Sequence, residues 1–172
     1  KNEFRVVHNV NVSPHALKLM KNIDVELYKC KVGHSNIKKM MRDVDADFGG
    51  EHSAHFYYRD NFYADSAILT LLTFMKMLTK NQKKISSVIN DYKFPPSSGE
   101  VNFAVEDVNN AIKKIESTFE GEFDKTDGLS CLQSNFWFNV RGSNTETKLR
   151  INVEADTQEI LDQVLERISS SI

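Results

Sequence analysis

The chain has 172 residues, 40% of them hydrophobic, and a formal net charge of -2 at pH 7. This length predicts one domain or two small ones, with enough apolar residues for a real core. The balanced charge provides no overall basic field, which argues against duplex nucleic acid as a partner. Any anion that the protein binds must therefore be held by local groups.

The cysteines and the apolar segments indicate a cytoplasmic protein. Cys30 and Cys131 lie far apart in the sequence without a CxxC or Cys-His spacing, so we expect thiols rather than a disulfide. No apolar run of signal-peptide length opens the chain. The segment ADSAILTLLTFMKML is shorter than the ~20 residues that a bilayer requires, and it carries Asp65 and Lys76. We interpret it as a buried core helix and expect no contact with a membrane.

In the first part of the chain, strand patterns alternate with helix patterns. The expected elements are a strand at 4–12, a helix at 14–20, a strand at 25–32, a helix at 36–44, strands at 46–50 and 56–60, and helices at 65–79 and 84–91. Ser13 and Pro14 are typical of an N-cap and a first helical position, and Ser35 is expected to cap the second helix. The alternation predicts an α/β domain with a layered sheet.

The stretch KFPPSSGE, residues 93–100, interrupts this alternation and predicts a linker. We place a boundary near Ser97, which gives domains of residues 1–96 and 97–172. The second domain is expected to contain a strand at 100–107, a helix at 108–119, strands at 128–133, 135–141 and 148–155, and a helix at 157–168. Grouped strands with two flanking helices predict a small α+β domain with an antiparallel sheet.

One candidate site is the stretch GGEHSAHFYYRD, residues 49–60, where Glu51, His52, Ser53 and His55 follow a glycine pair. An HxxH pair with a carboxylate is a weak metal signal here, since no third firm ligand and no helix accompany it. A polar loop that only meets solvent is the other simple interpretation. The glycine pair favours ligand binding, because it lets backbone and short side chains approach a ligand closely.

A second candidate is NVRGSNTETK, residues 139–148, in which Arg141 ends a strand and small polar residues follow. A guanidinium fork, hydroxyl groups and successive backbone N–H groups can together surround a phosphate. The same residues are also good hairpin-turn formers, and composition leaves both interpretations open. Arg150, on the next strand, is expected to add only background attraction. His34, in a Gly-His-Ser turn, is by itself more typical of a solvated or capping residue than of a catalyst.

Three segments resemble motifs of the α-D-phosphohexomutase family. FGGEHSAHFYYRDNFYADS resembles its sugar-binding signature GE-x-SGH, WFNVRGSNTETKLRINVEA its phosphate loop R-x-SNTEP-x-LR, and KVGHSNIKKMM a strand-turn-helix of its third domain. Their order and spacing agree over nearly the whole chain, and the signature favours the phosphomannomutase/phosphoglucomutase branch. The family fold has four domains around a cleft. This chain resembles the third domain without its first helix, followed by the whole fourth domain.

The resemblance implies an isomerase that moves a phosphoryl group between O1 and O6 of mannose or glucose through a hexose 1,6-bisphosphate, which also acts as activator. The family's phosphoserine loop and Mg²⁺ loop have no counterpart here, so Mg²⁺ would be bound by a domain absent from this chain. The chain alone is expected to be inactive, with the phosphosugar and the missing N-terminal domains as partners. Two rivals stay open: a non-catalytic phosphosugar-binding or interaction module, and a phosphoglucosamine mutase fragment.

The resemblance also implies a role for each candidate residue. Glu51, accepting two hydrogen bonds, and Ser53 would hold sugar hydroxyls, and His55 would shape that loop or contact the ligand. His34 would be the catalytic proton carrier near the reacting hydroxyl. Four residues would hold the phosphate far from the reacting end: Arg141, Ser143, Asn144 and Thr145.

Four positions depart from the family pattern. Ala54 replaces the second glycine of GE-x-SGH, which costs about 1 kcal/mol if the backbone there needs a positive φ. Gly142 stands where Pro or Ala is frequent, and Thr147 replaces the closing proline of the phosphate loop. Asn11 stands where the family usually has Lys or Arg, and the missing charge would weaken contact with a phosphorylated sugar.

Overall fold

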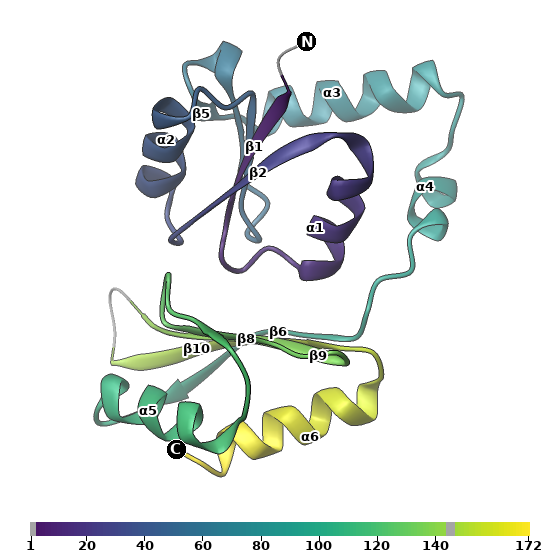
Figure 1. The fold of residues 1–172 in the computed structure, drawn as a ribbon. Coiled ribbons are helices and arrows are strands. Elements are labelled where there is room, and N and C mark those ends of the chain that lie inside the picture. Colours follow the sequence, from purple (N-terminus) through teal and green to yellow (C-terminus); the bar gives the residue numbers. More distant parts are fainter. Residues whose placement is uncertain (1–2, 144–146) are drawn as a thin grey trace. The chain divides into compact units, whose positions relative to one another are not determined.

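A computed structural model describes residues 3–143 and 147–172 and divides the chain into two compact units, Lys1–Phe94 and Pro95–Ile172 (Figure 1). Each unit contains its own five-stranded sheet. The expected fold classes, an α/β layered domain followed by an α+β domain with an antiparallel sheet, are confirmed. The linker expected over 93–100 is too long, because the first strand of the second unit already begins at Ser97.

The first unit has a mixed sheet in the order β2-β1-β3-β4-β5. Strand β1 runs parallel to β2 and β3, whereas β4 is antiparallel to β3 and β5. The strands are β1 Phe4–Asn9, β2 Val25–Cys30, β3 Phe48–Gly50, β4 Phe56–Tyr58 and β5 Ala64–Asp65. The helices are α1 Pro14–Met20, η1 Lys21–Ile23, α2 His34–Asp43, η2 Arg59–Asn61, α3 Ala67–Lys80 and α4 Ile85–Asp91. The sequence did not reveal β5, which has only two residues.

Helix α2 packs directly on strand β3, and a glycine makes this possible. An added Cβ on Gly49 would lie 2.7 Å from the sulfur of Met41 and 3.0 Å from a methyl carbon of Ile37. Both α2 side chains are fully buried, as is Tyr57 of the neighbouring strand β4. This contact fixes the helix, and the turn before it, against the sheet.

The two predicted helix caps have different outcomes. Ser13 caps α1 as expected, since its side chain accepts a hydrogen bond from the backbone N–H of Ala16. The prediction that Ser35 caps the next helix is wrong, because α2 begins at His34, two residues earlier than expected, with Gly33 at the N-cap. Gly33 has φ 118°, which only glycine adopts without strain, so the chain can turn into the helix sooner.

Helix α3 does not form part of the core, so the expectation of a buried core helix is wrong. None of its residues is buried, and Ile68, Leu71 and Met75 are more than half exposed. A groove of about 840 Å³ is lined by Phe74 and other α3 residues and by aromatic side chains of the sheet, including Phe48. The helix is apolar nearly all round, but the sheet covers only a part of it.

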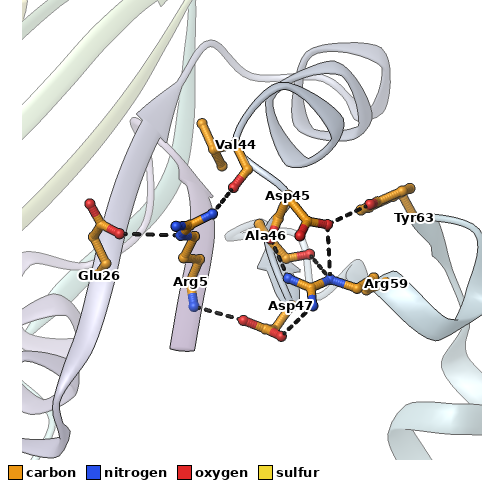
Figure 2. A network of polar contacts seen from close by, with 8 residues as sticks. All are labelled: Arg5, Glu26, Val44, Asp45, Ala46, Asp47, Arg59 and Tyr63. Carbon is orange, nitrogen blue, oxygen red and sulfur yellow. Dashed lines mark hydrogen bonds and ion pairs between the residues drawn. The ribbon is translucent and has the colours of Figure 1, made fainter. Parts of the chain in front are cut away.

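A polar network holds the amino-terminal ends of β1 and β3 together (Figure 2). The carboxylate of Asp47 accepts a hydrogen bond from the backbone N–H of Arg5 at 2.9 Å and lies 3.1 Å from the guanidinium of Arg59. The guanidinium of Arg5 donates to the carbonyl of Val44 at 2.8 Å and lies 3.4 Å from Glu26. These contacts tie β1, β2 and the end of α2 to β3 at the edge opposite the candidate residues.

The second unit is an antiparallel sheet in the order β6-β10-β9-β8-β7. Its strands are β6 Ser97–Ala104, β7 Phe123–Asp124, β8 Leu129–Leu132, β9 Phe136–Gly142 and β10 Lys148–Ala155. Helices α5 Val108–Thr118 and α6 Gln158–Ser169 lie on one face of this sheet (Figure 1) and cover its core. The other face carries the alternate residues of each strand, which include the candidate arginine.

Two further expectations concern the whole chain. Cys30 and Cys131 are buried thiols, one in each unit, and they are not joined in a disulfide. Among the described residues, no helix combines the length and the apolar character needed to cross a membrane.

Candidate functional site

The carboxyl ends of the three parallel strands of the first unit meet at one edge of its sheet. Asn9 ends β1, Gly33 follows β2 and Glu51 follows β3. In open α/β sheets this edge is where ligands bind. The loop that drew attention in the sequence therefore lies where a binding site is expected.

The carboxylate of Glu51 joins these strand ends. Its Oε1 accepts hydrogen bonds from the side-chain amide of Asn9 at 3.3 Å and from the backbone N–H of Gly33 at 3.1 Å. Its Oε2 accepts from the hydroxyl of Tyr57 at 2.6 Å. A carboxylate has about four acceptor sites, and these three donors occupy most of them. Burial and the bond to Glu51 raise the pKa of Tyr57, which keeps its hydroxyl protonated.

The loop after Glu51 is a closed turn with exposed side chains. The backbone N–H of Glu51 donates to the carbonyl of His55 and that of Ala54 donates to the carbonyl of Glu51, each at 3.0 Å. Ala54 has φ 62°, the left-handed conformation that the family's glycine would adopt without strain. The Ser53 hydroxyl lies 3.1 Å from Nδ1 of His55, and both side chains are exposed. The polar side chains of Ser53 and His55 thus face solvent side by side, near the carboxyl end of β3.

His34 is the first residue of α2 and is exposed. It directly follows Gly33, which is bonded to Glu51, so the structure brings His34 to the same sheet edge as the loop of Ser53 and His55. No side-chain contact joins His34 to that loop among the contacts that the described residues show. The exposed imidazole of His34 is therefore accessible at the edge where ligands bind in open α/β sheets.

Two polar residues at the carboxyl end of β1 also belong to this region: Asn9, which was not singled out from the sequence, and Asn11, which was judged only by its lack of charge. Asn9, 2% exposed, binds Glu51 and accepts the backbone N–H of Asn11 at 3.1 Å. Asn11 is 4% exposed, and its side-chain oxygen has no hydrogen-bond partner among the described residues. The signal in the sequence was the pair of amides, Asn9 and Asn11, at the end of the expected strand at 4–12. His8, next to them, is also buried, and burial lowers its pKa.

The second unit builds a cationic site on strands β9 and β10. Arg141 lies directly opposite Arg150 in the register of the two strands. Arg150 reaches the hydroxyl of Ser143 at 3.4 Å, and the backbone N–H of Ser143 donates to the carbonyl of Lys148 at 2.8 Å to close the turn. Arg150 therefore lies beside both Ser143 and Arg141. Asn144 and Thr145 lie outside the described residues.

A carboxylate accompanies the two arginines. Glu100 of β6 lies 3.4 Å from Arg141 and 3.2 Å from Arg150, through different oxygens. Two guanidinium groups and one carboxylate leave a net positive charge beside a serine hydroxyl. Such a group of donors suits the oxygens of a phosphate monoester.

The described residues do not form a metal site. Within 3–143 and 147–172, no three His, Cys, Asp or Glu side chains come close enough together to hold a metal ion. In the HxxH stretch, His55 lies 3.7 Å from the Glu51 carboxylate, but Asn9, Gly33 and Tyr57 already use most of the acceptor sites of that carboxylate.

Family models match both units. The model described as phosphoglucomutase/phosphomannomutase, alpha/beta/alpha domain III, matches residues 1–94. The model described as the C-terminal domain of phosphoglucomutase/phosphomannomutase matches residues 100–171. Each unit of the structure thus corresponds to one of the two matched models.

Curated relatives include a phosphomannomutase of Methanocaldococcus jannaschii, 35% identical over 100% of this chain and 38% of its own length. A phosphomannomutase of Escherichia coli K12 is 34% identical over 88% of this chain and 34% of its own length. The chain therefore spans little more than a third of the length of these two relatives.

Solved structures share the fold. A phosphoglucomutase/phosphomannomutase family protein of Burkholderia thailandensis has a TM-score of 0.84 at 22% identity, over 98% of this chain and 37% of that chain. An Aspergillus fumigatus N-acetylphosphoglucosamine mutase, solved with N-acetylglucosamine 6-phosphate and magnesium, has a TM-score of 0.73 at 13% identity, over 98% and 41%. The same Aspergillus enzyme has also been solved with glucose 1,6-bisphosphate. At these identities the likeness concerns the fold alone.

Proposed function

Because this chain belongs to the phosphoglucomutase/phosphomannomutase family, as its domain III and its C-terminal domain, we propose that it is part of a phosphohexomutase. The whole enzyme would interconvert the 1-phosphate and 6-phosphate of mannose or glucose through a bisphosphorylated sugar. The observation that carries this proposal is the pair of arginines beside Ser143, whose donors suit a phosphate monoester in a protein of small negative net charge.

The second unit would hold the phosphate that does not react. Arg141 and Arg150 supply guanidinium donors, and Ser143 supplies a hydroxyl. Asn144 and Thr145 complete the set that the family motif implies. The reaction moves a phosphoryl group from one end of the sugar to the other, so the bisphosphate must bind in two orientations. A loop that recognises only a phosphate can accept either end.

The first unit would hold the sugar. Ser53 and His55 offer exposed polar groups, and Glu51 retains one acceptor site for a sugar hydroxyl. When a sugar hydroxyl attacks a phosphoryl group it loses its proton, and His34 at the same sheet edge would accept it as a general base. The carboxylate of Glu51 supports this site mainly by holding three strand ends in place.

The remaining parts of the catalytic machinery would come from other domains of the same protein. Mg²⁺ would be bound there, since the described residues of this chain bring no three metal-ligating side chains together, and a hexose 1,6-bisphosphate would act as activator. The exposed apolar side chains of α3, such as Ile68 and Leu71, support a partner domain on this face of the first unit. The two buried thiols support a reducing, cytoplasmic location.

The test is a titration of the chain with mannose 6-phosphate and with glucose 1-phosphate, in which NMR spectra are recorded at each ligand concentration. Mannose, which has no phosphate, is the control. We expect weak binding that shifts the signals of the loop 51–55 and of Arg141 and Arg150, and no turnover with Mg²⁺ and a bisphosphate activator. Arg141→Lys should lose most of this binding, because lysine keeps the charge but not the guanidinium fork. Turnover by the chain alone, or shifts that mannose reproduces, would contradict the proposal.

The full-length protein should interconvert the two phosphates of mannose or glucose. Assays with mannose 1-phosphate, glucose 1-phosphate and glucosamine 1-phosphate decide the substrate. Activity on glucosamine 1-phosphate alone would favour a phosphoglucosamine mutase. Binding of phosphosugars without activity on any of the three would favour a non-catalytic binding module.

A further inference from the structure

Glu100 lies next to both arginines of the second unit because of the register of three adjacent strands. In β6 and β10, Glu100 is paired with Asn152 and Asn102 with Arg150, so the side chains of these residues share one face of the sheet. Arg150 is in turn paired with Arg141 across β10 and β9. The carboxylate of Glu100 on the edge strand β6 thus reaches across the intervening strand β10 to Arg141 on β9.

Two arginines directly opposite each other on neighbouring strands repel one another. Arg141 has a side chain only 8% exposed, so water screens its charge poorly. The carboxylate of Glu100 offsets this repulsion by placing one oxygen on each guanidinium, at 3.4 Å and 3.2 Å. A shared counter-charge of this kind lets the two guanidinium groups lie side by side.

The carboxylate does not use up the donors that a phosphate needs. A guanidinium has five N–H donors, and Glu100 approaches one terminal nitrogen of each arginine. Both distances exceed the ~2.7–2.9 Å of a tight charge-assisted bond, and neither contact is bidentate. Glu100 therefore orients the two groups without occupying their forks.

We propose that Glu100 is a positioning residue of the phosphate site, which holds Arg141 and Arg150 side by side before a phosphate binds. This proposal rests on the proposed function of the second unit as the site of the distal phosphate. Glu100 touches the arginines and acts on the phosphate only through them. A carboxylate close to a phosphate thus strengthens its binding, although the two groups carry the same sign of charge.

The experiment compares Glu100→Gln with Glu122→Gln in the 172-residue chain, using mannose 6-phosphate as the ligand. Glu122 is exposed and lies in the same unit, so its replacement removes the same charge away from the arginines. Simple electrostatics predicts tighter binding in both variants, because each loses a negative charge. Positioning predicts that Glu100→Gln raises the dissociation constant by about tenfold, while Glu122→Gln leaves it unchanged or lowers it slightly. Glu100→Asp, which keeps a carboxylate, should restore part of the affinity.

A second readout needs no ligand. In ¹⁵N NMR spectra of the wild type, the Nε–Hε signals of Arg141 and Arg150 should be separated from those of solvent-exposed arginines. In Glu100→Gln they should move toward the signals of exposed arginines. The backbone signals of the second unit should be retained, which shows that the variant is folded. Tighter or equal binding in Glu100→Gln, or unchanged arginine signals, would overturn the proposal. If the wild type does not bind mannose 6-phosphate at all, the proposed function fails, and the arginine signals still decide whether Glu100 positions the pair. If Glu100→Gln does not fold, Glu100→Asp is used for both measurements, with weaker changes expected in the same direction.

Discussion

The carboxylate of Glu51 shows how much of the candidate site depends on one side chain. It is 7% exposed and accepts hydrogen bonds from an amide, a backbone N–H and a phenol that come from three different segments of the chain. A buried carboxylate is tolerated only when its lone pairs are satisfied in this way. The exposed Ser53 and His55 next to it can interact with a ligand because Glu51 has already fixed the loop.

Ala54 carries backbone strain that a glycine would remove. Its φ of 62° is unfavourable for a residue with a Cβ, so Ala54→Gly should raise the free energy of unfolding by up to about 1 kcal/mol. Urea unfolding of both proteins measures this difference. Ala67→Gly, at the start of α3, serves as control and should lower the stability, because a helical alanine gains nothing from the change. Equal losses in both variants would contradict the strain at Ala54.

His8 predicts a pH dependence of stability. Burial lowers its pKa in the folded chain below the 6.5 of an exposed histidine, so the unfolded chain binds the proton more readily. The free energy of unfolding should therefore be highest above about pH 6.5 and fall as the pH decreases through the folded pKa. Urea unfolding between about pH 7.5 and pH 5 measures this slope. The slope should be smaller in His8→Gln, and an identical slope in the two proteins would show that His8 does not cause it.

At the scale of elements, α2 and β3 form the contact that positions His34 and the loop after Glu51. The sequence predicted a helix here, but only the structure shows that its Ile37 and Met41 side chains pack on β3 at Gly49, which has no side chain. The helix cannot shift outward without opening the buried cluster around Tyr57. The position of the helix start, and with it His34, follows from this close approach.

The glycine pair provides a matched test of this contact. Gly49→Ala should destabilise the chain by about 1–3 kcal/mol, because the new methyl group overlaps Met41 and Ile37. Gly50→Ala should cost much less, since its nearest neighbour, a ring carbon of Phe56, lies at an ordinary 3.5 Å. Thermal or urea unfolding of the two variants gives the comparison. Similar losses at both positions would mean that α2 does not rest on Gly49.

At the scale of the whole molecule, the two units have cores of different size. Counted over the described residues, the buried cluster of the second unit comprises 14 residues, whereas that of the first comprises 6. Helix α3 adds no buried residue to the first unit. Because burial of apolar surface is the main favourable term in folding, we expect the second unit to be the more stable.

Each unit contains one buried thiol that reports on its unfolding. Cys30 belongs to the first unit and Cys131 to the second. Labelling with a thiol reagent in increasing urea, followed by mass spectrometry of peptides, should modify Cys30 at lower urea than Cys131. The variants Cys30→Ser and Cys131→Ser each retain a single thiol, so labelling them shows which modified peptide belongs to which cysteine. Simultaneous labelling of both thiols would show that the units unfold together, and a disulfide between them would contradict the thiol prediction.

The sequence by itself determined most of the longer elements and the two motif loops. Apolar periodicity placed the long helices and strands, Ser13 and Pro14 marked the start of α1, and the glycine-flanked polar stretches pointed to both sites. These signals are local, because each depends on residues within a few positions of one another. The fold class followed from their order along the chain.

Only the tertiary structure decided which groups meet. The carboxylate oxygens of Glu51 accept hydrogen bonds from Asn9, Gly33 and Tyr57, which lie 42, 18 and 6 positions away in the sequence. No local sequence pattern predicts that these residues meet. The meeting of Glu100 with Arg141 and Arg150 depends on the register of three strands, which the hydrophobic pattern limits but does not specify for polar partners. Helix α3 has the composition of a core helix, yet burial is set by what packs against a helix, and in this chain its apolar side chains are left exposed.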